Sequence, residues 1–479
     1  MLYSLTLALP EITLTVASLV LLLVCAWGGE RSTRFVSVVA VAALVAAGFF
    51  ATLNPAGYGE GFGGLYRADA FAAFAKVLIY GATAVAIIVA PRFFEVERLK
   101  PEYPVLILLA TIGAGMMVSA GDLITLYIGL ELQSLASYVL ASFMRRDTRS
   151  AEAGLKYFVL GALASGILLY GASLVYGFAG TTAFDGIARS YAALDSGGHA
   201  TGLIFGLVFV FAGLAFKIAA VPFHMWTPDV YEGAPTPVTT LFATAQKVAA
   251  SALLVRVAIE VMGPAVDQWR QIVIFAALAS IILGAAGAIG QANIKRLLAY
   301  SSINNIGFAL IGLAAGTQAG AQAVLIYMAI YSVMTLGSFL CVLQMRTADG
   351  GQIESIASLS GLSRNHPGLA AAMAIFMFSL AGIPPLFGFW AKFAVFDAAV
   401  AAGFVALAVA GIIASVIGAY YYLRIVKTMY FDEPAPAFAR TSNLVENGLI
   451  AVFAIVIAVG YPLIPVLDTV TANAARALF

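Results

Sequence analysis

Several charged side chains of this sequence lie inside long apolar runs. Glu131, Lys217 and Lys247 are the clearest cases, and His224 and Lys392 share this setting. A charge in the interior of a bilayer costs several kcal/mol unless it has a partner or a function. Because burial in a medium of low dielectric lowers the pKa of an amine, a buried lysine can load and release a proton near neutral pH. These residue types therefore indicate transfer of protons or cations within a membrane.

One of these apolar runs is interrupted in a way that points to a broken helix. A span that contains Lys217 meets Pro222, His224 and Pro228 before a second apolar helix leads to Lys247. Irregular backbone at membrane depth is tolerated only where protein or a water-filled cavity surrounds it. The segment therefore favours an ion path, and the alternative is a proline-kinked helix whose lysines extend to the membrane surface.

Glu131 lies near the middle of its predicted span, where its side chain cannot reach water. Lys156 lies one hairpin further along the chain, and we predict that the two form an ion pair. A polar line through the middle of the membrane is thus predicted, and the alternative is that these groups hold helices together. Its residues are Glu131, Lys156, Lys217, His224, Lys247 and Lys392, joined by the hydroxyls of Tyr300, Ser301 and Ser302. Lys76, Arg256 and Arg424 lie nearer span ends and are expected to reach the lipid headgroups.

Composition places these residues in an all-α polytopic membrane protein. The chain has 479 residues, of which 62% are hydrophobic and 10% charged, too few to cover a water-soluble fold. A net charge of +1 without a basic patch excludes nucleic acid as a partner. Two isolated cysteines cannot hold an iron–sulfur cluster, and the aromatic and Met residues around His224 are typical of span packing, although His224 could ligate a haem. We expect no cofactor and no metal in this chain.

Gly, Pro and charge clusters divide the sequence into about fourteen spans of the length that a bilayer requires. The first has no basic n-region and carries Glu11, which favours a retained span over a signal peptide. The predicted spans are 2–27, 34–53, 69–91, 104–120, 122–144, 152–177, 202–222, 237–262, 271–292, 297–315, 320–345, 368–400, 403–430 and 444–467. The long connections 178–201 and 348–367 carry no cluster of polar side chains that suggests catalysis and are interpreted as structural.

Basic residues alternate from one side of the predicted spans to the other. One side has Arg31, Arg34, Arg92, Arg98, Lys100, Arg145, Arg146, Arg149, Lys295, Arg296, Arg346, Arg364, Lys427 and Arg440, and the other has only Arg67, Arg189, Arg270 and Arg476. Because positive loops face the cytoplasm, both termini are predicted to face away from it.

Two spans combine a proline break with a lysine. The first contains Pro222 and Lys217, and the second contains Pro384, Pro385 and Lys392, five spans later. An odd offset turns the second copy upside down, which predicts two inverted five-helix repeats. The alternative is two unrelated proline kinks. The predicted divisions are an N-terminal three-helix segment at 1–103, the repeats at 104–262 and 263–430, and a C-terminal span at 431–479.

Four motifs resemble a known family. The stretches PFHMWTPDVYEGAPTPV, IKRLLAYSSINNIGF, GLELQSLASY and GIPPLFGFWAKF are similar to the antiporter-like membrane subunits of proton-pumping NADH:quinone oxidoreductase, respiratory complex I. Of the three kinds of subunit, L, M and N, the chain is most similar to N. It has TTLFATAQKVAA where L and M usually carry a histidine motif, it ends without the long lateral helix of L, and it has Lys392 where M usually has a glutamate.

The resemblance implies a role for each residue. Glu131 and Lys156 would be a charged pair that modulates the site. Lys217 would be the central proton carrier and Lys392 the terminal carrier, and His224 and Lys247 would be the connecting relay. It implies that NADH, FMN, iron–sulfur clusters and quinone are held by other subunits, and that the partners are other membrane subunits of a hetero-oligomer, lipids and protons. The location would be a bacterial inner membrane. Two alternatives are a subunit of an Mrp-type Na+/H+ antiporter and a structural membrane subunit.

Overall fold

The computed structural model describes the whole chain except residues 95–98, 197–199, 348 and 440–442. Arg98 and Arg440, which were assigned above to the positive side, lie outside the described residues. Helices dominate the described part, and the only strands there are a short hairpin of β1 (Gly59–Gly61) and β2 (Tyr66–Ala68). The all-α membrane class predicted from the sequence is confirmed.

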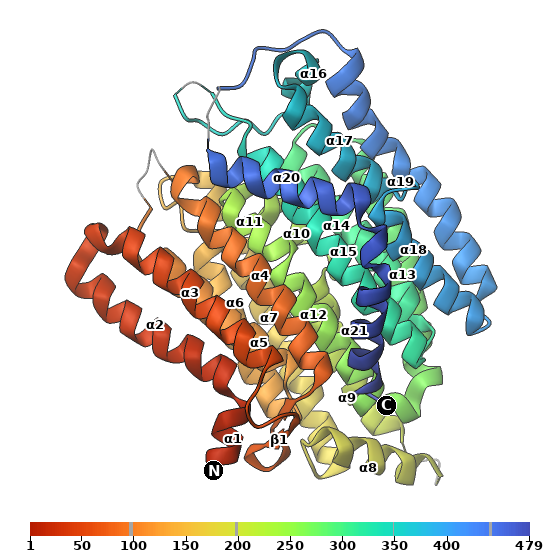
Figure 1. The fold of residues 1–479 in the computed structure, drawn as a ribbon. Coiled ribbons are helices and arrows are strands. Elements are labelled where there is room, and N and C mark those ends of the chain that lie inside the picture. The colour runs from red at the N-terminus through yellow and green to blue at the C-terminus, as the bar shows by residue number, and fades with distance from the viewer. Residues whose placement is uncertain (95–98, 197–199, 348, 440–442) are drawn as a thin grey trace.

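The N-terminal part is a group of four helices. They are α1 (Leu2–Leu7), α2 (Leu9–Gly28), α3 (Thr33–Thr52) and α4 (Ala70–Phe93). The predicted first span is therefore two helices, the second of which has Pro10 in its first turn, where the missing N–H is not needed. Helices α2 and α3 form a hairpin at the edge of the molecule, and α3 packs on α4 (Figure 1).

A second group contains the first broken element. Its helices are α5 (Glu102–Val118), α6 (Leu123–Ala141), α7 (Thr148–Ala179), α9 (Thr201–Ile218), α10 (Thr227–Gly233), α11 (Thr236–Ala243) and α12 (Ala245–Arg256). Helix α8 (Phe184–Ser196) lies across one end of the molecule, near both termini (Figure 1). The third group is α13 (Val266–Ile289), α14 (Ile294–Ala314), α15 (Gln318–Leu343), α16 (Leu362–Asn365), α17 (Pro367–Ala381), α18 (Phe387–Ala401) and α19 (Val405–Phe431), and α20 (Leu444–Val459) and α21 (Ile464–Arg476) follow it.

By length and apolar composition, ten helices in the described part of the chain can cross a membrane, or eleven if α20 and α21, which meet at 76°, form one bent span. In this count α2 and α3 are one continuous helical stretch, and α5 and α17 are apolar but shorter. The chain is therefore an integral multi-pass membrane protein, and the predicted number of fourteen spans stays a prediction.

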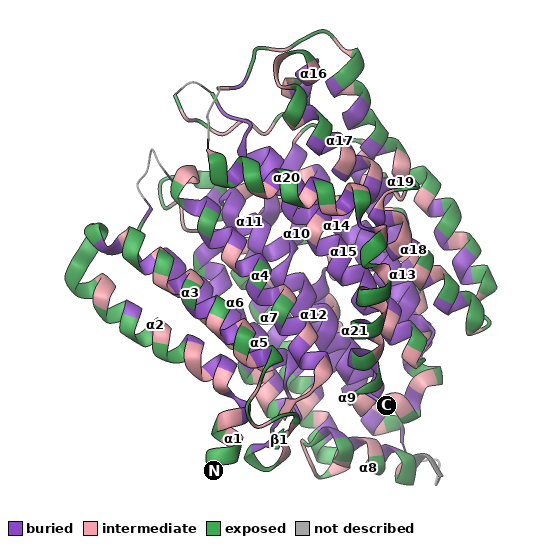
Figure 2. Cartoon of the chain, viewed as in Figure 1, coloured by how far each residue is buried: buried purple, intermediate pink, exposed green. Residues whose placement is uncertain are grey.

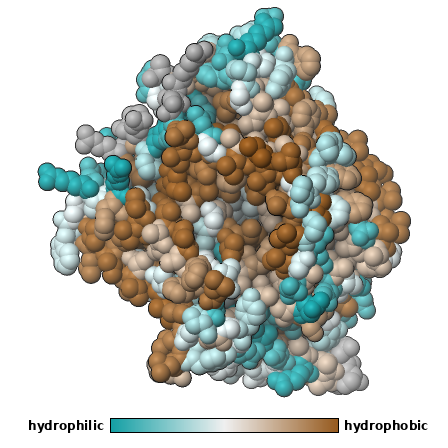
Figure 3. All heavy atoms as spheres, in the orientation of Figure 1, coloured by the Kyte–Doolittle hydropathy of each residue, from teal (hydrophilic) through white to brown (hydrophobic). Residues whose placement is uncertain are grey.

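Burial identifies the centre of the bundle. The most apolar window of α11–α12 is 100% buried, and those of α14 and α15 are 94% buried, whereas that of α2–α3 is 33% buried. Figure 2 shows this contrast between buried central helices and exposed outer ones. In Figure 3 apolar side chains form a broad band, with polar side chains gathered toward the two ends of the molecule. Lys217 of α9, Lys247 of α12 and Lys392 of α18 are buried within this bundle.

The second and third groups share a local feature at equivalent helices. Asp122 caps α6 and accepts from Thr125, and Asn293 caps α14 and accepts from Lys295. Next to each cap, a short antiparallel bridge joins the chain to the connection after the following helix, at Ala183 in one case and Ser355 in the other. These matched features favour an internal repeat, and the predicted repeat boundaries and their inversion stay predictions.

Candidate functional site

The first broken helix ends at a well-defined residue. Helix α9 stops at Ile218, and Ala219 takes a left-handed conformation with φ 59°. The N–H of Ala219 donates a hydrogen bond to the carbonyl of Phe216, and Pro222 then prevents the helix from continuing. Since a left-handed backbone is rare for a residue with a side chain, the surrounding packing holds this break in place. The break leaves the carbonyl of Ile218 without a helical partner.

Lys247 donates a hydrogen bond to that carbonyl. It lies on α12, its side chain is 1% exposed, and its Nζ donates to the oxygen of Ile218 at 2.6 Å. The ring of Trp226 lies 5.8 Å from the same nitrogen. Because the C-terminus of a helix carries partial negative charge, it stabilises a nearby ammonium. The break thus creates a position that binds a lysine cation through a carbonyl and an aromatic ring and not through a carboxylate.

The second break has the same construction. Helix α17 ends at Ala381, Gly382 follows with φ 86°, and α18 begins at Phe387. Lys392 donates to the carbonyl of Ala381 and to the hydroxyl of Ser415, each at 2.9 Å. Each break therefore places a buried lysine on the last carbonyl of the helix that precedes it.

This geometry corrects the expected pairing of the two breaks. The sequence pattern matched Lys217 with Lys392, but the residue that holds the equivalent position at the first break is Lys247. The reason is tertiary: Lys247 reaches the break from the neighbouring helix α12, whereas Lys392 reaches it from α18, the continuation of the broken helix itself.

Lys217 lies in the last turn of α9 and is 7% exposed. Its Nζ donates to the hydroxyl of Ser134 at 2.5 Å, and the ring of Tyr138 lies 5.8 Å away. Glu131 lies on α6 about one turn before Ser134, the residue that Lys217 contacts. One carboxylate oxygen of Glu131 is buried without a hydrogen-bond partner in the described part of the chain. Glu131 and Lys217 are thus near each other but are not joined by a direct ion pair.

The predicted pair of Glu131 and Lys156 is wrong. The Lys156 ammonium lies 2.7 Å from Asp229 on α10 and 2.6 Å from Glu152, one turn earlier on its own helix, and its side chain is 41% exposed. Spacing of four residues already favours the Glu152 contact. The partnership with Asp229 arises only because the break brings α10 against α7.

Helix α10 is held by further ion pairs from α14. Arg296 contacts Asp229 at 2.6 Å and Glu232 at 3.0 Å. Lys295, which is 2% exposed, donates to the carbonyls of Glu232 and Ala234 at 2.8 and 2.7 Å. From the sequence, both basic residues indicated only the orientation of the chain. They instead fix the segment that follows the first break.

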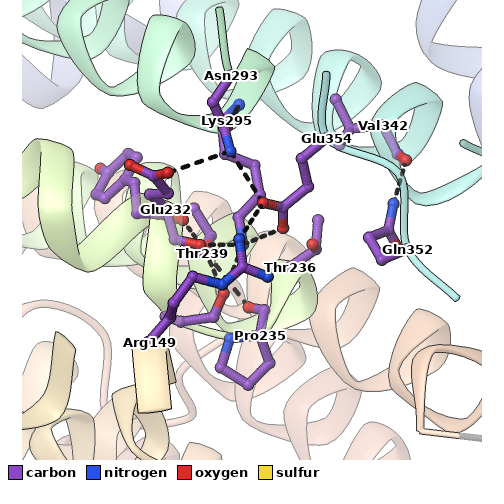
Figure 4. Close-up of polar contacts among 12 residues, drawn as sticks. Arg149, Glu232, Pro235, Thr236, Thr239, Asn293, Lys295, Val342, Gln352 and Glu354 are labelled. Atoms are coloured by element: carbon purple, nitrogen blue, oxygen red, sulfur yellow. Dashed lines mark hydrogen bonds and ion pairs between the residues drawn. The ribbon is translucent and has the colours of Figure 1, made fainter. Parts of the chain in front are cut away.

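Glu354 joins this group from the connection between α15 and α16. Figure 4 shows its carboxylate between Lys295, at 3.1 Å, and Arg149, at 3.4 Å. Burial alone would raise the pKa of Glu354, but the Lys295 ammonium and a hydrogen bond from Asn293 lower this pKa below its ordinary value. Glu354 therefore remains a carboxylate at neutral pH. The 348–367 connection thus contributes a buried ion-paired carboxylate, and its interpretation as structural stays a prediction.

Buried polar side chains on α14, α15 and α19 lie between the two breaks. Ser301 and the hydroxyl of Tyr422 are 2.5 Å apart, and Asn305 donates to Tyr422 at 3.1 Å and accepts from Tyr327 at 2.7 Å. Three of these four were not identified from the sequence, although the asparagine pair in SSINN, inside an apolar span, was a signal.

The other predicted connecting residues differ in setting. Ser302 is buried and its hydroxyl has no hydrogen-bond partner among the described residues, whereas Tyr300 is only half-buried. His224 has its Nδ1 buried without a partner among the described residues, and no hydrogen bond joins it to Lys217 or Lys247 there. The connecting role of His224 and Tyr300 stays a prediction.

Two basic residues expected at the lipid headgroups are buried instead. Lys76 lies 2.7 Å from Glu11 and donates to the hydroxyl of Tyr66 at 2.7 Å. Arg256 is fully buried and pairs with Asp69 and Glu260, at 2.7 and 2.6 Å. Since Glu11 and Asp69 come from distant parts of the chain, position within a span did not reveal these two partners.

Removing one partner of the buried Glu11–Lys76 pair should destabilise the protein by about 3–5 kcal/mol, because the other charge is left uncompensated. We expect Lys76→Met to lower the apparent melting temperature of the purified protein, and Lys76→Met combined with Glu11→Gln to recover most of the loss. Lys100→Met, which removes an exposed partner of Glu30, is the matched control and should change little. Equal effects of the single and double variants would contradict a coupled pair.

Comparisons with known proteins agree on one group. The profile of the family described as "NADH:quinone oxidoreductase/Mrp antiporter, TM" matches residues 120–418. A protein of Rhizorhabdus wittichii named NADH-quinone oxidoreductase subunit N is 67% identical over 99% of both chains. A chain in the structure of respiratory complex I from Thermus thermophilus with bound aureothin is 30% identical, with a TM-score of 0.83 over 97% of this chain and 99% of that one. A chain of the Mrp complex from a Dietzia species has the same fold, with a TM-score of 0.84 over 99% and 98% of the two chains, at 23% identity.

Proposed function

The chain belongs to the NADH:quinone oxidoreductase/Mrp antiporter family of membrane subunits, and from this membership we propose that it translocates protons as a subunit of a bacterial NADH:quinone oxidoreductase. It is similar to named N subunits along its whole length. In this proposal the chain contributes proton transfer to the complex and no redox centre. NADH, FMN, iron–sulfur clusters and quinone would be held by other subunits.

One observation about the lysines carries the proposal. The sequence has eight lysines, and five of them form ion pairs with carboxylates: Lys76, Lys100, Lys156, Lys295 and Lys427. The remaining three, Lys217, Lys247 and Lys392, are all buried and donate to neutral oxygens. An ammonium that forms no direct ion pair with a carboxylate loses its proton more readily in a medium of low dielectric than a paired one does. A purely structural role would favour paired lysines.

The proposed path follows these three residues. Lys217 is the central carrier, and the charge of Glu131 sets how readily it holds its proton. Lys247 is the next carrier, stabilised as a cation by the carbonyl of Ile218. The buried group around Asn305 then provides hydroxyl and amide contacts on the way to Lys392, the terminal carrier.

The arrangement of the chain ends supports a proposal for orientation. Both termini lie at the same end of the molecule as α8 (Figure 1). The turn between α2 and α3, which carries Arg31 and Arg34, lies at the other end of that hairpin. Because basic loops face the cytoplasm, we infer that both termini face away from it, and that other membrane subunits of the complex cover part of the outer helices.

The transported ion distinguishes this function from the main alternative, a subunit of a sodium–proton antiporter. We expect the complex, reconstituted into vesicles and supplied with NADH, to acidify the vesicle lumen equally in buffers with and without sodium. Uptake of radioactive sodium should not accompany the reaction. Pumping that needs sodium, or sodium uptake lost with Lys217→Ala, would favour the antiporter.

The corrected ion pairs give a second test. Lys156→Ala and Asp229→Asn should each lower proton pumping, and the loss in the double variant should be smaller than the sum of the two single losses, since both variants break the same contact. Losses of Lys156→Ala and Glu131→Gln should instead add on a free-energy scale, within about 0.5 kcal/mol, because these residues share no contact. A strong coupling between Glu131 and Lys156 in the double variant would restore the pair that the sequence predicted.

A further inference from the structure

A groove outside the polar line lies between the N-terminal hairpin and the rest of the molecule. Its volume is about 1250 Å³, more than the roughly 300–1,000 Å³ of pockets that hold drug-sized molecules. Its walls are Val38 and Val41 of α3, Ile87 and Ile88 of α4, and Val445 at the start of α20. Val38 is 62% exposed and Ile88 39%, so the walls face outward, where a bilayer supplies acyl chains.

The mouth of the groove has a different chemistry from its walls. Arg31 and Arg34, from the turn between α2 and α3, line it together with the hydroxyls of Thr33 and Ser37. Both arginines are exposed, and the structure records no ion pair or side-chain hydrogen bond for either one within the described residues. Glu30, which also lines the mouth, contacts Lys100. Two guanidinium groups that have no partner among the described residues therefore lie at the mouth of an apolar groove.

The placement of these two features determines the chemistry of the occupant. A guanidinium binds phosphate oxygens with two parallel hydrogen bonds. Arginines at a membrane surface attract anionic lipid headgroups, each contributing about 1 kcal/mol. A glycerophospholipid with a net negative headgroup would place its phosphate at Arg31 and Arg34 and its acyl chains against Val38 and Ile88. A zwitterionic lipid carries its own cation and would gain less from two uncompensated guanidiniums.

We propose that this groove is a headgroup-selective site for an anionic phospholipid, in the leaflet that faces the positively charged loops. The lipid differs from ordinary boundary lipid because the site selects its headgroup charge. It would also fill the space between the hairpin and α20, whose first turn is held to α4 by the pair of Glu446 and Arg92 at 2.5 Å. The proposal depends on the chain's position in a bilayer and not on proton transport, so pumping is not its readout.

The test uses the intact complex in nanodiscs that contain phosphatidylglycerol with a photoactivatable group on one acyl chain. After illumination, mass spectrometry should find the probe on peptides of α3 and α4 that contain Val38 and Ile88. The double variant Arg31→Ala and Arg34→Ala should reduce this labelling by about thirtyfold, because it removes two arginines that each contribute about 1 kcal/mol to binding. Arg145→Ala with Arg146→Ala is the matched control, because these arginines are an adjacent exposed pair on the same side but do not line the groove.

Two further experiments distinguish headgroup-selective binding from general contact with lipid. The same probe with a phosphatidylcholine headgroup should label the groove much less than phosphatidylglycerol does. Val38→Trp, which fills the groove, should reduce labelling by both probes while the arginines stay in place. Equal labelling by the two headgroups, labelling unaffected by the arginine variants, or crosslinks only to a neighbouring subunit would each overturn the proposal.

Discussion

Replacing Lys217 by alanine should reduce proton pumping by the complex at least about tenfold, which corresponds to 1.4 kcal/mol or more in the transfer barrier. The variant removes the proposed carrier, whose ammonium donates to the Ser134 hydroxyl, so no direct ion pair among the described residues is broken. Assembly of the complex should therefore be largely intact. The measurement is acidification of vesicles driven by NADH, alongside the amount of assembled complex.

The arginine variant gives the sharper result. Lys217→Arg keeps a positive charge and most of the side-chain volume, but a guanidinium does not deprotonate in proteins. We expect pumping nearly as low as with alanine. Lys100→Arg is the matched control, because Lys100 is exposed and paired with Glu30, and pumping should be unchanged there. If Lys217→Arg pumps normally, Lys217 is a fixed charge and not a carrier.

The second large effect is expected at Lys392. Lys392→Met conserves length and apolar volume while removing the proton, so pumping should fall at least about tenfold while the helices around it stay packed. Ser415→Ala should cost much less, since the carbonyl of Ala381 still accepts from the ammonium. Normal pumping by Lys392→Met would exclude Lys392 as a carrier.

The break itself can be tested without changing the lysine. A Cβ atom added to Gly382 would lie 2.8 Å from Cδ of Lys392, so Gly382→Ala should displace the lysine and lower pumping. Gly403→Ala is the matched control. It has nearly the same φ, 87° against 86°, but nothing lies within 4 Å of its added Cβ. Both variants strain the backbone equally, so only a difference between them reports on Lys392. Equal pumping by the two would show that the position of Lys392 on Ala381 does not matter.

Much of the fold could be predicted because the bilayer imposes length and composition on each helix. Almost every predicted span coincides with an observed helix or broken pair, for example 320–345 with α15 (Gln318–Leu343). The break after Lys217 and the break at Pro384 and Pro385 were both identified, since proline cannot continue a helix. Burial of Lys217, Lys247 and Lys392 also followed from the sequence alone.

Which polar groups meet was not predictable, because it depends on residues that are distant in the sequence. The pair of Glu131 and Lys156 was inferred from a single hairpin, whereas Asp229 reaches Lys156 only after the chain breaks and turns back. Arg256 and Lys76 were placed at the headgroups because the sequence contains no sign of Asp69 or Glu11 as neighbours.

The sequence by itself determined that the chain lies in a membrane, where its helices break and that Lys217, Lys247 and Lys392 are buried, because apolar length and proline act locally. Only the tertiary structure decided what each lysine contacts. Five meet carboxylates, whereas Lys247 and Lys392 meet carbonyls that two broken helices leave unpaired, and Lys217 meets a serine hydroxyl. The physical reason is that a charge in low dielectric is stabilised by whichever oxygen lies within about 3 Å of it, and helix packing alone sets that distance.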